Sequence, residues 1–123
     1  MILVDTAVWI DHLHSAEPQL VELLGLDQVG YHPLIVEEMA LGSIRGRDVV
    51  LGLLANLRQF PSVGHDEILH LTDQRRLWGR GLNAVDVHLM AAVALVPGAQ
   101  LWTRDKRLKS ACSDAGVRLF DGR

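Results

Sequence analysis

The chain has 123 residues, 49% of them hydrophobic, with one cysteine and a formal net charge of −3. This length predicts one domain, residues 1–123, with a single core, and the acidic total argues against a protein that coats nucleic acid with a broad basic face. One cysteine excludes an internal disulfide, and because neither a signal peptide nor an apolar run of roughly 18 residues is visible, we expect a cytoplasmic protein without a membrane span.

Short apolar strand patterns alternate with helical patterns along the chain. Strands are predicted at residues 2–4, 29–31, 61–64, 100–103 and 117–120. Helices are predicted at residues 6–12, 17–24, 33–44, 47–57, 66–78, 84–96 and 106–115, with Pro18 and Pro33 in first turns and Gly25 and Gly116 as C-terminal caps. This alternation is typical of a parallel sheet covered on both faces. We therefore predict an α/β fold, a three-layer α/β/α sandwich around a central parallel sheet.

Two carboxylates directly follow predicted strands. Asp5 comes after strand 2–4 in the opening MILVDTAVWIDHL, and Asp105 comes after strand 100–103 in LWTRDKRL. Asp is among the preferred N-cap residues, so each carboxylate alone has a structural explanation. In parallel sheets, however, ligands bind beyond the carboxyl ends of the strands, and both residues are predicted to lie there.

A third carboxylate, Asp86, lies on the apolar stripe of its predicted helix. Its helical neighbours include Leu89, Met90 and Val93, and desolvating an unpaired carboxylate is costly. A capping box with Asn83 is a competing explanation for its position, although it does not explain the apolar neighbours.

The fourth acid is either Glu37 or Glu38, which periodicity alone does not separate. Carboxylates crowded into one cleft repel each other, and a cation that neutralises them is the usual reason for such an arrangement. Carboxylate and water ligands favour Mg²⁺ or Mn²⁺ over Zn²⁺. The six histidines lack a zinc-hydrolase spacing, and the sequence has no Gly-rich phosphate loop and no nucleophile elbow.

The order LVDTAVWIDHL, VEEMALG, NAVDVHLMAA and LWTRDKRL resembles a PIN domain of the VapC toxin type across nearly the whole chain. The resemblance implies a Mg²⁺-dependent endoribonuclease, with Mn²⁺ as a possible substitute, that cuts RNA such as tRNA or rRNA through a metal-activated water. It also implies a type II toxin that forms homodimers and is inhibited by a VapB-type antitoxin. The catalytic and metal-binding positions of the family fall on Asp5, Glu38, Asp86 and Asp105, and Thr103 matches a hydroxyl residue that precedes the last acid by two.

Two further sets of residues are predicted to meet the partners that the resemblance implies. Basic side chains beside the acids are candidates for RNA-backbone contacts, which position RNA without reading its sequence; they are Arg80, Arg104 and Lys106. Apolar side chains of the first two helices are candidates for a groove that holds an antitoxin helix, with core packing as the alternative; they are Trp9, Leu13, Leu20 and Leu24.

Two other functions stay open from the sequence. A receiver-like phosphoacceptor domain also has a parallel sheet and an acidic Mg²⁺ pocket, but it needs adjacent acids after the first strand and a lysine after the last. Here Val4 and Thr6 flank Asp5, and no lysine follows residues 117–120. A catalytically silent PIN-like binding module is the second alternative, against which the intact set of acids argues.

Overall fold

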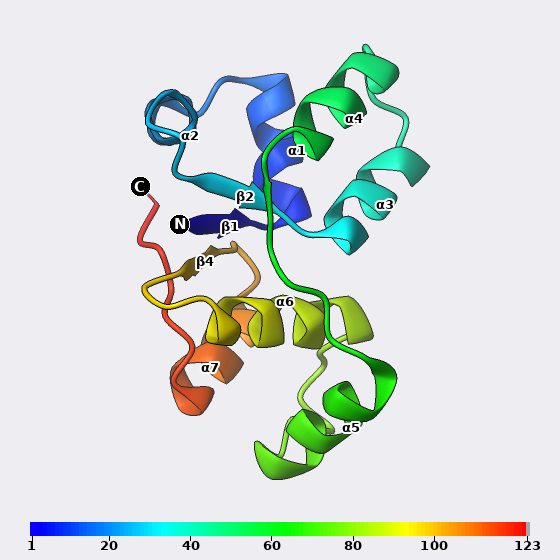
Figure 1. Ribbon diagram of the computed structural model, residues 1–123, viewed down its shortest axis with the longest axis vertical. Coiled ribbons are helices and arrows are strands. Elements are labelled where there is room, and N and C mark those ends of the chain that lie inside the picture. The colour runs from blue at the N-terminus through cyan, green and yellow to red at the C-terminus, as the bar shows by residue number, and fades with distance from the viewer. Residues whose placement is uncertain (123) are drawn as a thin grey trace.

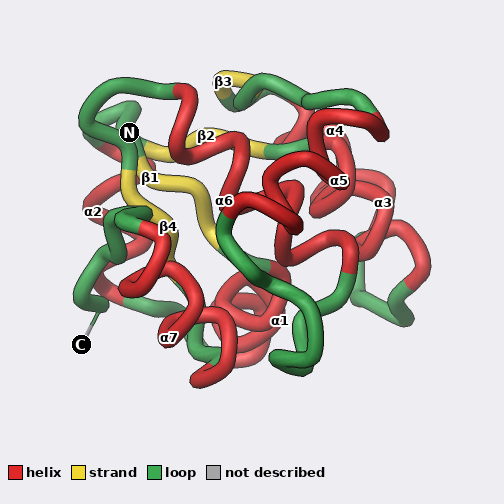
Figure 2. Tube along the Cα trace, turned by 90° about the horizontal axis from the view of Figure 1, so that it is seen from below, coloured by secondary structure: helices red, strands yellow, loops and turns green. Residues whose placement is uncertain are grey.

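The computed structural model describes residues 1–122, which fold around a four-stranded parallel sheet. The strand order is β3–β2–β1–β4. The strands are β1 (Ile2–Val4), β2 (Val29–Tyr31), β3 (Arg58–Gln59) and β4 (Gln100–Trp102). Every pairing is parallel, with Ile2 opposite both Val29 and Gln100. Figure 2 shows these short strands enclosed by a mostly helical chain.

Helices cover both faces of the sheet, so the predicted three-layer architecture is confirmed. On one face lie α1 (Thr6–His14), α2 (Pro18–Gly25), α3 (Pro33–Leu41) and α4 (Arg47–Ala55). On the other lie α5 (His65–Gln74), α6 (Ala84–Leu95) and α7 (Lys106–Ala115), as Figure 1 shows. Within residues 1–122, no helix has the length and apolarity that crossing a bilayer requires.

The strands that precede the predicted acids are anchored in the core. Leu3 and Val4 of β1 and Leu101 of β4 are wholly buried, and Trp102 is 1% exposed. Burial of each such side chain contributes roughly 1.5 to 3 kcal/mol. The segments that follow these strands are therefore held in fixed positions.

Two predicted strands are wrong. Residues 61–64 form no strand, because sheet pairing ends where the Phe60 amide donates to the Tyr31 carbonyl and Pro61 has no N–H to continue it. The actual edge strand is β3, just before this segment. Residues 117–120 contribute only an isolated bridge between Leu119 and Leu101.

The helices lie where they were predicted, but of their C-terminal ends only that of α7 matches, and the others differ by one to four residues. α3 ends at Leu41 rather than at residue 44, and α5 ends at Gln74 rather than at residue 78, since Arg76 has a left-handed backbone with φ 54°. Gly25 is the last residue of α2 rather than its cap. Gly116 caps α7 as predicted, with φ 75°.

Candidate active site

The four predicted acids line one open pocket of about 490 Å³ at the carboxyl end of the sheet. The lining residues are Asp5, Thr6, Ala7, Glu38, Asn83, Asp86, Arg104 and Asp105. The acids come from four separate segments: the end of β1, the middle of α3, the first turn of α6 and the residue before α7. The sheet order makes this possible, because β1 lies between β2 and β4 and the segments after these strands meet at one edge.

Asp5 is both a helix cap and part of the pocket. Its Oδ1 accepts a hydrogen bond from the Thr6 amide at 2.8 Å, which caps α1, and its Oδ2 accepts one from Thr103 Oγ1 at 2.7 Å. Thr103 is only 2% exposed. A buried hydroxyl therefore fixes the orientation of a carboxylate that also lines the pocket.

Glu38, rather than Glu37, reaches the pocket. Thr6 Oγ1 donates to Glu38 Oε1 at 2.6 Å, while the side chain of Glu37 is exposed. Sequence reasoning missed Thr6 as a functional residue. The available signal was a hydroxyl residue directly after Asp5, where the start of a helix turns its side chain back toward the strand end.

Asp86 satisfies both of its competing explanations. It forms a complete capping box with Asn83. The backbone N–H of Asn83 donates to Asp86 Oδ2 at 3.0 Å, and the backbone N–H of Asp86 donates to Asn83 Oδ1 at 2.8 Å. Burial is the largest cause that raises the pKa of Asp86; the hydrogen bond from Asn83 opposes it, and the charges of Asp5, Asp105 and Glu38 raise the pKa further. Asp86 is thus both a helix cap and a member of an anionic site that it shares with three other carboxylates.

Asp105 caps α7 through Oδ1, and within residues 1–122 its Oδ2 accepts no hydrogen bond. Its Oδ1 accepts hydrogen bonds from the amides of Arg107 at 2.9 Å and Leu108 at 3.1 Å. The Asp105 amide donates to Thr103 Oγ1 at 3.2 Å. Thr103 thus links Asp5 to Asp105, as Thr6 links the start of α1 to Glu38.

The donor set fits a hard divalent cation that keeps part of its water shell. Across residues 1–122, no three Asp, Glu, His or Cys side chains converge closely enough to ligate one ion together. Mg²⁺ usually retains several waters and takes one or two carboxylates plus substrate phosphates, so direct convergence of three acids is not required. Arg104 also lines the pocket, but its guanidinium pairs with Asp11 and Glu17 rather than with the four acids. This basic side chain therefore does not take the place of an ion among them.

Comparison with known proteins assigns the chain to a family. No family model matches it. It is 68% identical over 121 residues, 98% of each chain, to Ribonuclease VapC32 from Mycobacterium tuberculosis strain CDC 1551 / Oshkosh and, with the same values, from strain ATCC 25618 / H37Rv. The chain belongs to the VapC family of PIN-domain ribonucleases. This membership decides against the receiver-like alternative.

A crystal structure agrees with the VapC assignment at the level of the fold. The structure of PAE2754 from Pyrobaculum aerophilum superimposes with a TM-score of 0.59, covering 89% of this chain and 83% of that chain, at 19% sequence identity. The three-layer arrangement is therefore shared across a large sequence distance.

Two of the three predicted RNA contacts are occupied by other interactions. Arg80 donates to Asp114 Oδ2 at 2.8 Å and to Ser110 Oγ at 3.2 Å, both on α7. Arg104 pairs with Asp11 of α1 and, at 3.1 Å, with Glu17 before α2. The RNA contacts of Arg80 and Arg104 stay predictions, and both side chains already pair with carboxylates within the fold. Lys106 is exposed at the start of α7, and its contact with RNA stays a prediction.

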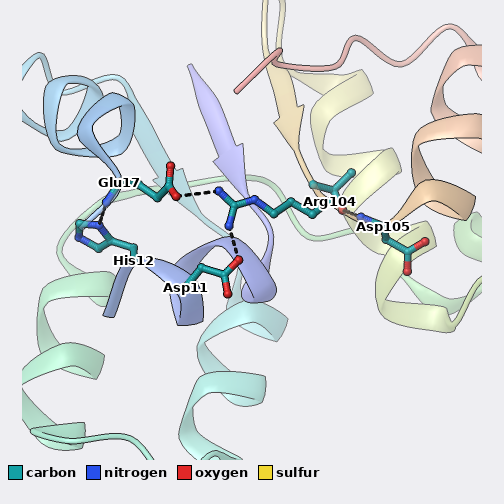
Figure 3. Close-up of polar contacts among 6 residues, drawn as sticks. Asp11, His12, Glu17, Arg104 and Asp105 are labelled. Carbon is teal, nitrogen blue, oxygen red and sulfur yellow. Dashed lines mark hydrogen bonds and ion pairs between the residues drawn. The ribbon is translucent and has the colours of Figure 1, made fainter. Parts of the chain in front are cut away.

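Arg104 ties the loop before α7 to the opposite layer of the domain. Figure 3 shows its side chain reaching toward Asp11 and Glu17 while the Asp105 carboxylate points the other way. Burial acts to lower the pKa of Arg104, but the hydrogen bonds with Asp11 and Glu17 outweigh it and raise the pKa. These ion pairs of Arg104 therefore help to fix the loop in which Asp105 directly follows it.

An apolar groove lies where the antitoxin groove was predicted, and three of the four predicted residues line it. This groove of about 290 Å³ is lined by Trp9, His12, Leu13, Leu24, Val50, Leu53, Leu54 and Leu57. Leu20 is wholly buried and belongs to the core instead. The binding of an antitoxin there stays a prediction. The prediction also missed the second wall, which is α4. Periodicity along α1 and α2 carries no information about which later helix packs beside them.

Proposed function

We propose that this protein is a Mg²⁺-dependent endoribonuclease and the toxin of a type II toxin–antitoxin pair. One observation carries the proposal: four carboxylates from four separate segments line one pocket, in a chain of the VapC ribonuclease family. Mn²⁺ is the expected substitute ion, because it shares the preference for carboxylate and water ligands. The proposed substrates are structured RNAs such as tRNA or rRNA, and the proposed place of action is the cytoplasm.

The residues of the pocket have separable roles. Asp5, Glu38 and Asp86 would hold the ion directly or through water, and Oδ2 of Asp105 would complete the donor set. When bound, Mg²⁺ supplies a water of lowered pKa and a positive charge that stabilises the attacked phosphate. Thr6 and Thr103 orient Glu38 and Asp5 through hydrogen bonds of 2.6 and 2.7 Å. Held in this way, the carboxylates need little rearrangement when the ion arrives.

The proposal is tested by RNA cleavage with a matched pair of glutamate variants. The purified protein should cut RNA with Mg²⁺ or Mn²⁺ and stop when EDTA is added. Glu38→Gln should abolish cutting, while Glu37→Gln, an identical change at the exposed neighbour, should leave it unchanged. Cleavage that persists in excess EDTA would contradict the metal mechanism. RNA binding without any cleavage would favour the silent binding module. Mapping new RNA 5′ ends after brief expression would identify the target.

We further propose that the groove of α1, α2 and α4 holds a helix of a VapB-type antitoxin. It is almost wholly apolar, and Leu53 on its rim is 64% exposed, which suits the apolar anchors of a helix in a groove. Leu53→Asp should weaken antitoxin binding. Leu69→Asp is the matched control, because Leu69 is 51% exposed on α5, outside the groove. Equal binding of the antitoxin by both variants would place the interface elsewhere.

The VapC resemblance also leads us to propose a homodimer. Light scattering coupled to size-exclusion chromatography would test this for the free protein and for the antitoxin complex. A monomer at micromolar concentration in both forms would exclude it.

A further inference from the structure

Arg107 carries a positive charge that no described residue neutralises. It lies in the first turn of α7, and its backbone amide donates to Asp105 Oδ1 at 2.9 Å. Within residues 1–122, its guanidinium has neither an ion pair nor a hydrogen bond, whereas Arg80 and Arg104 are both paired with carboxylates. Arg107 is therefore the guanidinium beside the acid pocket that is free to meet an anion.

The side chain of Arg107 passes close to a glycine. A Cβ atom placed on Gly81 would lie 2.6 Å from Arg107 Nη1, 2.7 Å from Cδ and 3.1 Å from Cζ. Any other residue at position 81 would displace the guanidinium, and the backbone there is also left-handed, with φ 79°. Gly81 therefore leaves the room that the exposed guanidinium occupies.

Arg107 lies between two segments that each supply residues of the pocket lining. Gly81 lies two residues before Asn83, which lines the pocket and caps the helix of Asp86. Arg107 itself lies two residues after Asp105. The side chain thus connects the segment that carries Asp86 with the segment that carries Asp105.

The loop that holds Arg107 is fixed to α7 by a second contact. Arg80, directly before Gly81, donates to Asp114 and Ser110 at 2.8 and 3.2 Å. These bonds keep the Gly81 backbone against α7, on which Arg107 lies. The backbone that lies beside the Arg107 side chain is therefore itself tied to α7.

We propose that Arg107 binds an RNA phosphate next to the one that is cleaved. The inference rests on the proposed ribonuclease function. A guanidinium can bind a phosphate through two parallel hydrogen bonds. An arginine without a carboxylate partner beside a phosphodiesterase site is therefore suited to bind a phosphate of the substrate. Such a contact positions the RNA backbone over the acid pocket without reading its sequence. Unlike Arg80 and Arg104, Arg107 would make this contact without giving up an ion pair within the fold.

The test measures RNA affinity as a function of salt, using a fluorescently labelled RNA stem-loop in EDTA so that no cutting occurs. Arg107→Gln should reduce the slope of log affinity against log salt by about 0.7 to 0.9, the value of one lost phosphate contact. Affinity should fall roughly tenfold, which is near the lower end for hydrogen bonds to charged groups. Arg118→Gln removes the same charge outside the acid pocket and should change neither quantity.

Cleavage kinetics in Mg²⁺ give a second readout. Arg107→Gln should raise KM by the same factor of about ten and change kcat by less than about threefold, since the contact is made in both ground and transition state. Gly81→Ala should reproduce the loss of slope, and the double variant Gly81→Ala, Arg107→Gln should lose no more than either alone. Thermal melting identifies any variant whose fold is damaged, and Arg107→Lys should keep the slope while losing part of the affinity.

The outcomes separate this inference from the proposed function. If the wild type cuts RNA but Arg107→Gln keeps its KM and salt slope, or changes them no more than Arg118→Gln does, the Arg107 contact is refuted and the ribonuclease proposal stands. If the wild type cuts no RNA with either metal while Arg107→Gln still lowers the slope, the proposed function fails and the RNA contact stands.

Discussion

Replacing Asp86 with Asn should make the metal-free protein more stable while abolishing RNA cleavage. Two opposing effects set the magnitude. Burial and the charges of Asp5, Asp105 and Glu38 disfavour the ionised carboxylate, and each unit of raised pKa corresponds to about 1.4 kcal/mol. Asp86 remains partly open to solvent, so screening reduces this gain.

The opposing effect comes from the capping box. In the wild type the backbone N–H of Asn83 donates to Asp86 Oδ2 at 3.0 Å. Asn at position 86 keeps an oxygen that can accept this hydrogen bond, so the bond is retained. The lost charge at the helix N-terminus costs about 0.3 to 1 kcal/mol. We expect a net stabilisation of about 0.5 to 2 kcal/mol, the usual gain from a single stabilising change, which raises the Tm of a domain of this size.

The assay is thermal melting in EDTA and in Mg²⁺, alongside RNA cleavage. Glu67→Gln is the matched control, because Glu67 is also the third residue of its helix but lies exposed on α5, away from the pocket. The control should lose about 0.3 to 1 kcal/mol and keep its activity. Asp86→Asn should also lose most of the stabilisation that Mg²⁺ gives the wild type. If Asp86→Asn is destabilised like the control and keeps the full Mg²⁺ effect, the shared anionic site is refuted.

Three further outcomes are expected. Thr103→Val removes the buried hydroxyl that joins Asp5 to Asp105, so urea unfolding should show a loss of about 1 to 3 kcal/mol and cleavage should fall at least about tenfold. The gain in stability from Asp86→Asn should vanish below pH 3.8, the ordinary pKa of Asp, because Asp86 is then protonated in both the folded and the unfolded wild type. Above pH 3.8 the unfolded state loses this proton before the folded state does, so melting in EDTA should show the gain growing as pH rises toward the raised pKa of folded Asp86. Burial, with the charges of Asp86 and Asp5, raises the pKa of Cys112 to about 12, so a thiol reagent at pH 8 should label Cys112 only after unfolding.

Local signals in the sequence account for most of the pocket. Asp5 and Asp105 each follow an apolar strand at a good N-cap position, so strand pattern and cap preference place both at the same edge of a parallel sheet. The helical period places Asp86 toward the core. These inferences need only neighbouring residues in the chain, and the structure brings the three side chains to one pocket.

What the sequence did not predict depends on contacts between distant residues. Periodicity left Glu37 and Glu38 equivalent, and only the family resemblance selected Glu38; the contact that orients it comes from Thr6, 32 residues away along the chain. Arg80 and Arg104 looked like free cations beside acids, but their partners lie 34 and 93 residues away. No local pattern shows that a surface arginine is already neutralised, or that Gly81 makes room for another.

The acids of the pocket differ in what fixes them, and this difference follows from where each one lies in its helix. Asp5, Asp86 and Asp105 each accept a backbone amide at a helix start, where the helix dipole favours a negative charge even before a cation binds. Glu38 lies in the middle of α3 and depends on the Thr6 hydroxyl at 2.6 Å. Three helix starts therefore offset part of the repulsion among the carboxylates. Part of it remains, because burial and then the charges of Asp5, Asp105 and Glu38 raise the pKa of Asp86. A divalent cation at the proposed site would relieve this remaining repulsion.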